Sequence, residues 1–419
     1  MRSTIDRLVQ LLERSGPVIL LESQSGGHPS SRKSYLAAQP EAVLQARGSH
    51  ISIHKKDEKA AFRANPWDAL SGFRAEQKEW IFGYLGYDLK NSLETLHSNN
   101  PDPVGAPDMF FMVPGLLAEI DHRRNELRML KGTLPEEAGA SAADEDAFTI
   151  HSFDPDVKKE HYIAQVREAQ RRIREGEFYE INLTRQIRAV YSGGGYGLYK
   201  KMRAIGPVPF GAYLTFDEWT VCSLSPERFL KKEGPRVISQ PIKGTIRRGT
   251  TGPEDASLKE ELKHSLKNRA ENLMIVDLVR NDLSRIAVPN TVSASELFEI
   301  QTFGTLHQMV STVEAETLVS DPVDIIKACY PMGSMTGAPK IRVMESIEEL
   351  ENYRRGIYSG AIGYITPAGD FDFNVVIRTA ILKDEQLFYS VGGAITGDSS
   401  PEAEWEETVV KARALTGIH

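Results

Sequence analysis

IYSGAIGYITPAGDFDFNVVIRTAILKDEQLFYSVGGAI, residues 357–395, is the stretch of the sequence that indicates the fold. Apolar, β-branched and aromatic runs at 357–365, 373–382 and 388–394 predict three strands, because such residues fit a pleated sheet. Between the first two runs, 366–370 reads TPAGD, a combination that is typical of a tight turn. Strands joined by turns this short pair antiparallel. The stretch therefore predicts an antiparallel sheet.

Outside this stretch, helix and strand patterns follow one another irregularly. Apolar residues three and four positions apart predict helices at 5–12, 161–175, 256–286, 340–350 and 401–415. Runs rich in apolar, β-branched and aromatic residues predict strands at 18–21, 80–87, 179–184, 210–216, 220–224, 237–242, 291–297 and 309–315. The long helices are too few and too irregularly placed for repeated β-α-β winding, so the sequence favours an α+β fold.

Length, composition and charge exclude several classes of protein. The chain has 419 residues, of which 41% are hydrophobic and 26% charged, so it is globular rather than disordered or fibrous. Fifty Lys and Arg against 58 Asp and Glu give a net charge of −8, which argues against nucleic acid or a membrane surface as a partner. Cys222 and Cys329 form neither a disulfide framework nor a zinc motif. Charged residues interrupt the apolar runs before signal-peptide or membrane-span length, so we expect a cytoplasmic protein.

A change in composition divides the chain. Residues 132–147 read GTLPEEAGASAADEDA, in which small, acidic and turn-forming residues replace the periodic apolar pattern. We expect an acidic linker or long loop here. It separates an N-terminal region, 1–147, from a larger region, 148–419.

The predicted C-terminal helix has a clear start, since Ser400 suits an N-cap and Pro401 the first helical position. Within the helix, Glu404, Glu407 and Lys411 share one face. A solvated acidic face with a Glu407–Lys411 ion pair is the simpler interpretation of this spacing. A metal-binding face is the alternative.

The helix predicted at 256–286 carries Glu271 beside the apolar run LMIVDLV at 273–279, which predicts burial of this part of the helix almost all round. A buried carboxylate needs a cation, either Lys267 four residues earlier or a metal ion. Together with the acidic face of the C-terminal helix, Glu271 could hold a hard divalent ion. Mg²⁺ suits such a set of oxygen ligands without His or Cys.

Two other segments offer a pair of reactive groups. SPE at 225–227 and QPIKGT at 240–245 place Glu227 and Lys243 at the ends of two predicted strands. Brought together, a carboxyl group and an amine can serve as general acid and as nucleophile or base, provided that the amine is neutral. A surface salt bridge is the alternative. The Gly-rich segments match neither a phosphate loop nor a dinucleotide motif, so nucleotide binding is not supported.

Taken together, these motifs resemble one family, the chorismate-utilising enzymes. The resemblance extends from 161 to 415 and rests on these segments, in order: FYEINLTR, SLSPERFL, QPIKGTIRRG, ENLMIVDLVRNDLSRIA, TFGTLHQMVSTV, PMGSMTGAPK, YSGAIGYI, NVVIRTA, VGGAITGDS and PEAEWEETVVKA. LLES at 20–23 and GYLGYDL at 83–89 extend it more loosely to the N-terminal region. It implies a large interleaved body of two packed, mostly antiparallel β-sheets with helices on the outside, and a chorismate-binding catalytic region at 148–419.

The resemblance also implies roles for individual residues. Glu271, Glu404 and Glu407 match the carboxylates of a Mg²⁺ site, the last acting through water. Glu227 matches the general acid that protonates the departing C4 hydroxyl of chorismate. The other matches are substrate-binding positions: Arg378 and Tyr358 at the enolpyruvyl carboxylate, Gly392, Gly393 and Lys411 near the ring carboxylate, and Ser334 and His307 elsewhere in the site.

Lys243 distinguishes between activities within the family. PIKGT resembles the aminodeoxychorismate synthases, whose lysine attacks C2 of chorismate, whereas anthranilate synthases usually read PIAGT. Ammonia then adds at C4 and the lysine departs, which gives 4-amino-4-deoxychorismate on the route to p-aminobenzoate and folate. The resemblance thus favours aminodeoxychorismate synthase component I. Anthranilate synthase component I is the alternative, and a catalytically silent regulatory partner of an amidotransferase is the alternative from another class.

Several positions depart from the family pattern. Glu180, also a substrate-binding candidate, stands where isochorismate and salicylate synthases carry a water-activating lysine, which argues against those activities. Asn268 replaces a commoner acidic residue and Ala394 a commoner Gly, which leaves the surroundings of the ion and the ring carboxylate open. LLES resembles a tryptophan-binding motif, and tryptophan binding also stays open. No Cys-centred glutaminase pattern is present, so the resemblance implies a separate glutamine amidotransferase subunit, or free ammonia, as the nitrogen source.

Overall fold

The turn predicted at 366–370 joins two strands in the computed structural model, β18 (Ala361–Ile365) and β19 (Phe371–Val375). These strands pair antiparallel, and the Thr366 N–H donates to the Asp370 carbonyl at 2.8 Å across the turn. The structure describes residues 2–24, 32–56, 58–135, 147–155, 157–304 and 306–417. Most of the expected linker, 136–146, lies outside the described residues.

The strands form one hydrogen-bonded network, and every pairing within the described ranges is antiparallel. Two arms of the network meet at β1 (Val18–Glu22), which pairs with β2 (Lys33–Arg47) and with β10 (Phe210–Phe216). From β2 the first arm continues through β6 (Met109–Asp121), β5 (Ile81–Leu85), β18, β19, β12 (Arg228–Glu233), β13 (Arg236–Gln240) and β16 (Leu306–Glu316). From β10 the second arm continues through β11 (Trp219–Ser225), β20 (Thr379–Lys383), β21 (Gln386–Ile395) and β9 (Glu180–Gly193).

Shorter strands extend both arms. On the first arm these are β3 (His50–Lys55) beside β2, β4 (Glu58–Arg63) beside β3, β7 (Glu126–Lys131) beside β6, and β14 (Ile242–Arg247) and β15 (Ser293–Thr302) beside β16. On the second arm these are β8 (Phe148–Pro155) and β17 (Gly337–Ala338), both beside β9.

The two arms pack face to face as a sandwich. A buried apolar layer between them contains Phe82 and Phe110 from the first arm and Phe216, Ile381 and Phe388 from the second. The rings of Phe110 and Phe216 have centroids 4.6 Å apart. Two packed antiparallel sheets therefore form the body, as predicted, and their side chains alternate between this layer and the outer faces.

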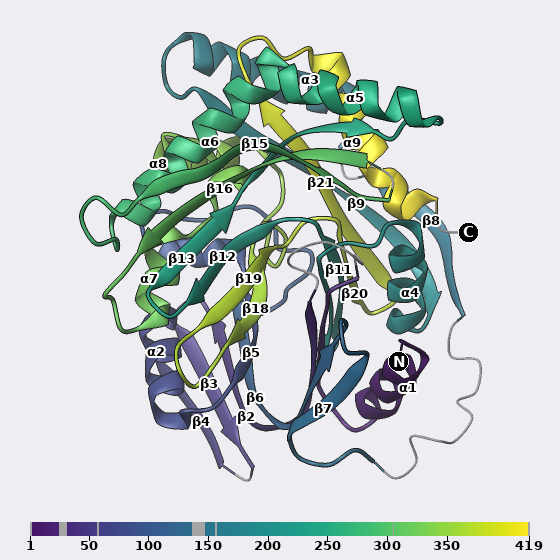
Figure 1. The fold of residues 1–419 in the computed structure, drawn as a ribbon, viewed down its shortest axis with the longest axis vertical. Helices are drawn as coiled ribbons and strands as arrows, with labels where there is room; N and C mark the ends of the chain where they lie inside the picture. The colour runs from purple at the N-terminus through teal and green to yellow at the C-terminus, as the bar shows by residue number, and fades with distance from the viewer. Residues whose placement is uncertain are drawn as a thin grey trace.

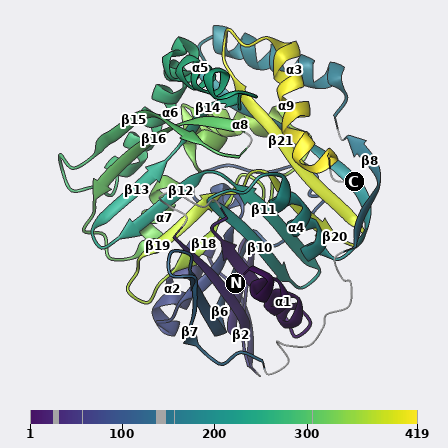
Figure 2. The same ribbon diagram turned by 45° about the vertical axis from the view of Figure 1, so that its right-hand side comes forward.

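Helices cover the outer faces of both arms (Figure 1 and Figure 2). On the first arm these are α2 (Pro66–Gln77), α6 (Leu266–Ser284) and α7 (Pro322–Cys329). On the second they are α1 (Arg2–Glu13), α4 (Gly195–Ile205) and α9 (Pro401–Thr416). α3 (Lys159–Arg174) and α8 (Lys340–Leu350) pack on β9, and α5 (Gly252–His264) lies beside β14. The described parts of the chain also contain the short 3-10 helices η1 (Tyr87–Ser92) and η3 (Gly333–Met335).

Strands from 1–147 and from 148–419 are neighbours in the network. β1 pairs with β10, and β5 pairs with β18 so that Gly83 lies opposite Gly363. On its other side β5 pairs with β6, where a Cβ on Gly83 would lie 1.9 Å from the Phe110 carbonyl oxygen, so the close approach of β5 to β6 requires glycine. Both parts of the chain therefore contribute to the same sheets.

The long helix predicted at 256–286 is interrupted and is less buried than predicted. Ser265 leaves the helical conformation with ψ of 110°, and its hydroxyl accepts the Asn268 N–H at 3.3 Å, so it ends α5 and caps α6. Leu273 is 42% exposed whereas Val276 is buried. The apolar run thus presents only one face of α6 to the core.

The strand predicted at 373–382 is also two strands, β19 and β20. Between them Arg378 adopts a φ of 51°, which a regular strand does not allow. Its carbonyl accepts the Leu224 N–H at 3.1 Å, which ties the break to β11. A left-handed backbone at a charged residue often marks a functional site.

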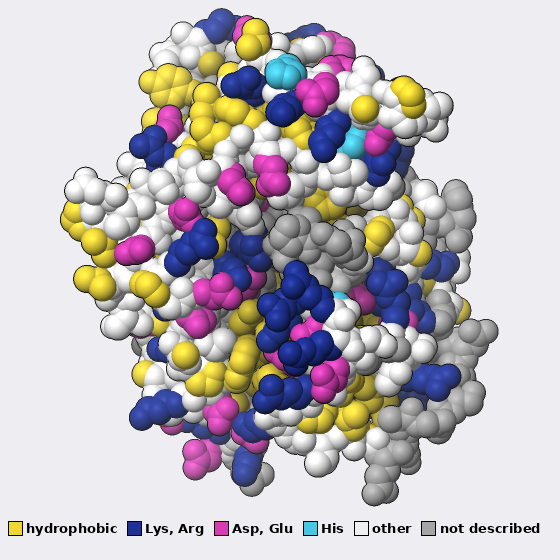
Figure 3. Space-filling view, in the orientation of Figure 1, with side chains coloured by type: hydrophobic (Ala, Val, Ile, Leu, Met, Phe, Trp, Pro, Cys, Tyr) yellow, Lys and Arg dark blue, Asp and Glu magenta, His cyan; other side chains and the backbone are white. Residues whose placement is uncertain are grey.

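The surface carries charges of both signs. On the face drawn in Figure 3, basic and acidic side chains are interspersed over most of the molecule. Of the described helices, none is long and apolar enough to cross a bilayer. Because basic and acidic side chains are mixed on this face, a charged ligand must be attracted by the groups next to its binding site.

Candidate active site

Lys243 lies at an irregularity in its strand. In the pairing of β14 with β16, Lys243 and Gly244 together lie opposite one residue, Met309. This is a β-bulge, which bends the strand and re-aims a side chain. Gly244 has a φ of 93°, which favours glycine. The bulge at Lys243 and Gly244 therefore allows the Lys243 side chain to point away from the regular β14–β16 pairing.

The Lys243 amine meets Glu180, the first residue of β9. Lys243 Nζ lies 2.6 Å from Glu180 Oε1, and the two side chains are 10% and 1% exposed. Burial alone would lower the pKa of Lys243, but Glu180, Glu271 and Glu227 raise it, and the net shift is upward. The amine is therefore a buried ammonium group among carboxylates.

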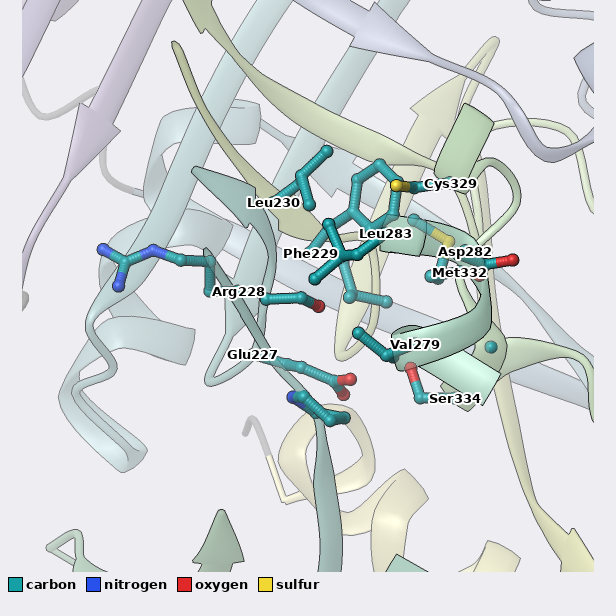
Figure 4. A pocket seen from close by; sticks show the side chains of 14 residues that line it. Glu227, Arg228, Phe229, Leu230, Val279, Asp282, Leu283, Cys329, Met332 and Ser334 are labelled. Atoms are coloured by element: carbon teal, nitrogen blue, oxygen red, sulfur yellow. The ribbon is translucent and has the colours of Figure 1, made fainter. Parts of the chain in front are cut away.

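Glu227 lies in the loop between β11 and β12 and is 4% exposed. Burial raises the pKa of its carboxyl group to about 7, while the Ser334 hydroxyl and the Lys243 charge oppose this rise. Figure 4 shows the side chains of Glu227 and Ser334 facing each other. A carboxyl group that titrates near neutrality is suited to donate a proton at neutral pH.

A small cavity lies beside Glu227 and Ser334 (Figure 4). Its volume is about 10 Å³, close to the minimum for one water molecule. Asp282, on its wall, accepts from Lys340 Nζ at 2.6 Å. Lys340 is thus held in a largely buried ion pair that supports this wall.

Arg378 is a cation that has no carboxylate partner among the described residues. Burial lowers the pKa of its guanidinium, with Tyr389 and Glu227 opposing. Tyr358, in the loop before β18, is 5% exposed, and Tyr389 on β21 acts electrostatically on it as well. A partly buried guanidinium without a counter-ion is suited to bind a carboxylate ligand.

α9 brings two carboxylates against β21. A Cβ built on Gly393 would lie 3.0 Å from Glu404 Oε2 and 3.5 Å from Glu407 Oε1. Lys411 Nζ donates to the Gly392 carbonyl at 2.7 Å and pairs with Glu407 at 2.7 Å. The Glu407–Lys411 ion pair suggested by their spacing is therefore present, and Gly393 leaves room beside Glu404.

Glu271 faces the same region from α6, where it acts electrostatically on Lys243 and Glu407. Burial raises the pKa of Glu271 and of Glu404, and neighbouring carboxylates add to both shifts. Lys267 Nζ is 3.8 Å from Glu271 Oε1, too far for a good hydrogen bond. Poorly compensated oxygen ligands have the chemistry of a Mg²⁺ site. Within the described ranges, however, no three acidic, His or Cys side chains converge closely enough to hold a metal ion.

Comparison with known proteins identifies the family. The family model described as chorismate binding enzyme matches residues 16–417. This chain belongs to the chorismate-binding enzyme family. The match spans both sides of the expected linker and contains every site residue described above.

Relatives within the chorismate-binding enzyme family carry different names. The chloroplastic aminodeoxychorismate synthase of Arabidopsis thaliana is 38% identical over 96% of this chain, which spans 45% of that relative's length. Anthranilate synthase component 1 of Aquifex aeolicus is 32% identical over 97% of this chain and 90% of that protein. The crystal structure of anthranilate synthase component I from Streptococcus pneumoniae TIGR4 superposes with a TM-score of 0.82 at 27% identity, covering 93% of each chain. Relatives named for two different activities, aminodeoxychorismate synthase and anthranilate synthase, are thus similar to this chain at comparable sequence identity.

In this chorismate-binding enzyme, the side chain of His307 contacts residues of two neighbouring elements. Its ring is buried, with Nε2 3.0 Å from Asp255 Oδ1 and Nδ1 2.9 Å from Thr302 Oγ1. Among the described contacts it meets neither Glu227 nor Lys243. The structure therefore places His307 on β16, where its ring contacts Asp255 of α5 and Thr302 of β15.

The two departures from the family pattern have structural neighbours. The Asn268 side chain packs 3.1 Å from the position of a Cβ on Gly244, and its Nδ2 donates to Ser265 Oγ at 2.9 Å. Asn268 thus supports the bulge beside Lys243. Ala394 lies on β21 opposite Asn182 of β9, next to Gly393.

A buried ion pair behind the site was missed by the sequence patterns. Arg355 and Glu351 are each 1% exposed and approach to 2.6 Å. Arg355 also donates to the carbonyls of Met335 and Asn182, each at 2.7 Å, while Glu351 accepts from both the N–H and the hydroxyl of Thr184. The pair therefore ties η3 to β9. Only opposite charges four apart in the irregular segment ENYRRG hint at it in the sequence.

The LLES segment leads into a polar cluster inside the second arm. Glu22 is 3% exposed and accepts hydrogen bonds from Arg203, Tyr199 and Gln24. Its carboxylate is thus satisfied by side chains of the same chain.

Proposed function

We propose that this chain is an aminodeoxychorismate synthase component I, which converts chorismate and ammonia to 4-amino-4-deoxychorismate. The observation that carries the proposal is the placement of Lys243, whose amine is buried, aimed by a bulge and paired with Glu180. A lysine so placed supplies a nucleophile that a small residue in PIAGT would not. Membership in the family of chorismate-binding enzymes supports chorismate as the substrate.

In the proposed reaction, Lys243 acts as the nucleophile and Glu227 as the general acid in the same displacement step. Neutral Lys243 Nζ forms a bond to C2 of chorismate as the C4–O bond breaks, and Glu227 protonates the departing hydroxyl so that it leaves as water. Ammonia then bonds to C4 and the C2–Nζ bond breaks, which releases Lys243. The raised pKa of Glu227 supports its role as the acid.

Substrate carboxylates would be held by the cationic and backbone groups around this pair. Arg378 and Tyr358 suit the enolpyruvyl carboxylate, because Arg378 has no carboxylate partner among the described residues. Lys411 and the strand at Gly392 and Gly393 suit the region of the ring carboxylate. Glu271, Glu404 and Glu407 are also proposed as the residues that would hold Mg²⁺, although the described side chains do not converge closely enough to hold it in this structure. When bound, the ion would offset repulsion between these carboxylates and an anionic substrate.

Ammonia is proposed to come from a separate glutamine amidotransferase subunit, or from free ammonium. The name "component 1" of the Aquifex relative implies a second component for that protein. We extend this arrangement to the present chain, with the product directed to p-aminobenzoate and folate synthesis.

Product identification tests the proposal directly. Purified protein is incubated with chorismate, Mg²⁺ and ammonium, and the product is identified by chromatography and mass spectrometry. We expect 4-amino-4-deoxychorismate, which keeps the enolpyruvyl group. Anthranilate as the direct product would refute the assignment and support the second candidate, anthranilate synthase component I, which the Aquifex and Streptococcus relatives favour. A Lys243→Ala variant should lose 4-amino-4-deoxychorismate and shift toward anthranilate.

A further inference from the structure

Glu180 is a buried carboxylate whose hydrogen-bond partner, among the residues that the structure describes, is Lys243. Its side chain is 1% exposed, and Oε1 accepts from Lys243 Nζ at 2.6 Å. Its other oxygen, Oε2, is buried and has no hydrogen-bond partner among the described residues. An unsatisfied buried carboxylate oxygen is costly, so its retention beside the amine calls for a functional explanation.

The charges around Lys243 come from several elements. Glu180 on β9 touches the amine, while Glu227 between β11 and β12 and Glu271 on α6 act on it from further away. Glu407 on α9 is influenced by the same amine. This surplus of carboxylates stabilises the ammonium form, which has no lone pair and cannot attack carbon. A proton acceptor in contact with Nζ is therefore required, and Glu180 is the group in that position.

We propose that Glu180 holds Lys243 in position and accepts its proton when chorismate binds, which converts the ammonium to the attacking amine. This inference rests on the proposed function and deepens it. Glu180 thereby gains a role different from the substrate contact expected from the sequence. Its free oxygen Oε2 gives the protonated acid a place to keep the proton without breaking the contact from Oε1.

The proton balance closes over one turnover. Lys243 gives one proton to Glu180, which leaves a neutral amine and a carboxylic acid. Nζ bonds to C2, the C4–O bond breaks, and the hydroxyl leaves as water with the proton of Glu227. Ammonia bonds to C4 as the C2–Nζ bond breaks, and the new C4 ammonium returns one proton to Glu227. Lys243 finally recovers its own proton from Glu180.

The experiment compares wild type with Glu180→Gln, Glu180→Asp and the matched control Glu177→Gln. Gln keeps the size and a hydrogen-bond acceptor but removes the charge and the basicity. Glu177 lies three positions earlier and pairs with Arg342 in a partly exposed contact, so the same Glu-to-Gln change there is remote from the amine. Circular dichroism checks the folding of each variant.

The first readout is independent of catalysis. Reductive methylation with formaldehyde and cyanoborohydride modifies amines only in their unprotonated form. Peptide mass spectrometry measures the rate of methylation at Lys243 as a function of pH. Removal of the Glu180 charge favours the neutral amine, so the midpoint for Lys243 should move to lower pH in Glu180→Gln and by less in Glu180→Asp. It should not move in Glu177→Gln. An unchanged midpoint in a folded Glu180→Gln variant would overturn the proposal.

The second readout is turnover. At neutral pH we expect kcat of Glu180→Gln to fall about 100-fold or more, the usual scale for loss of a general base, with partial recovery in Glu180→Asp. The remaining activity of Glu180→Gln should rise with pH as Lys243 loses its proton to solvent. Wild-type kcat in that variant would overturn the proton transfer. If the wild-type protein forms no 4-amino-4-deoxychorismate, both the proposed function and the proton transfer to Glu180 are refuted. The shift in the methylation midpoint still decides separately whether Glu180 stabilises the Lys243 ammonium.

Discussion

Gly393 of β21 and Glu404 of α9 face each other so closely that a Cβ on the glycine would lie 3.0 Å from Glu404 Oε2. The neighbouring Gly392 faces a different obstacle, since its Cβ would lie 2.3 Å from the Leu183 carbonyl oxygen of β9. One glycine thus leaves space for the carboxylates, whereas the other allows two strands to pair.

Gly393→Ala should weaken binding more than folding. The added methyl group pushes against the ends of flexible carboxylate side chains, which can move, but only by leaving the proposed ion and ring-carboxylate site. We expect the KM for chorismate and the Mg²⁺ concentration for half-maximal rate to rise about tenfold, equivalent to about 1.4 kcal/mol. Steady-state kinetics and thermal melting check both parts.

The matched variant Gly392→Ala should behave in the opposite way. Its methyl group meets backbone, which cannot move without disturbing the β9–β21 pairing, so we expect about 1–3 kcal/mol of destabilisation, as for other overpacked sites. Equal loss of stability in the two variants would contradict this division of roles.

The raised pKa of Glu227 predicts the pH dependence of catalysis. Because the acid must be protonated, kcat should fall as pH rises above about 7. Glu227→Gln should have a low kcat at every pH and should lack this transition. A wild-type profile that is flat between pH 6 and pH 8 would be inconsistent with Glu227 as the acid.

The same group predicts a change in stability with pH. The pKa of Glu227 rises from 4.5 in its ordinary state to about 7 in the fold, so its contribution is full below pH 4.5 and is lost as pH rises toward 7. The loss amounts to about 3 kcal/mol at most. Relative to Glu227→Gln, the wild-type free energy of unfolding should decrease over this interval, which urea titrations at several pH values measure.

Arg378→Gln should impair substrate binding without loss of stability. The guanidinium has no carboxylate partner among the described residues, so its removal leaves no described carboxylate unpaired. We expect KM for chorismate to rise about 10- to 100-fold, the scale of a charged hydrogen bond. Arg280→Gln, at an exposed ion pair on α6, is the control and should leave KM unchanged. A wild-type KM for Arg378→Gln would rule out the proposed carboxylate contact.

Arg355→Met should destabilise the protein strongly. The change leaves Glu351 buried without its cation, which typically costs about 3–5 kcal/mol, and it frees η3 from β9. The double variant Arg355→Met with Glu351→Leu should recover much of this loss because no buried charge remains. Urea unfolding measures both, and a loss below about 1 kcal/mol in the single variant would show that the pair is dispensable.

Glu271→Gln should reduce the response to Mg²⁺. We expect the Mg²⁺ concentration for half-maximal turnover to rise at least about tenfold, with thermal stability within a few degrees of wild type. Asp277→Asn changes a carboxylate on the exposed face of the same helix, where its side chain is 69% exposed, and should have no effect. Wild-type Mg²⁺ dependence in Glu271→Gln would exclude this residue from the ion site.

Features of the fold encoded by neighbouring residues could be predicted from the sequence. The turn at 366–370 and the strands around it follow from local preferences of Pro, Gly and β-branched residues. The break at Arg378 could not be predicted in this way, because VVIRTAIL is a continuous strand pattern and the break depends on a contact with Leu224 of β11. Ser265 was missed for the related reason that one serine in a helical pattern is compatible with either a cap or an interior position.

The candidate site depends more heavily on distant contacts. Glu180 and Lys243 are 63 positions apart and lie on strands of different arms, so only the packing of the two arms against each other brings them to 2.6 Å. The resemblance to a family named both residues, but not their contact. Arg355 and Glu351 carry only the weak signal of opposite charges four positions apart. The groups that hold the pair in place belong to two other segments, at Met335 and at Asn182 and Thr184.

The position of β1 between two arms has a consequence for protein engineering. A fragment that starts at residue 148 would lack β1 and β5, which would leave the edges of β10 and β18 without their partners. Unpaired edges rich in apolar residues recruit other chains and promote aggregation. The region that carries Glu227, Lys243 and Arg378 should therefore not be expressible as an independent unit, whereas co-expression with residues 1–135 as a separate polypeptide should restore a folded, complemented protein.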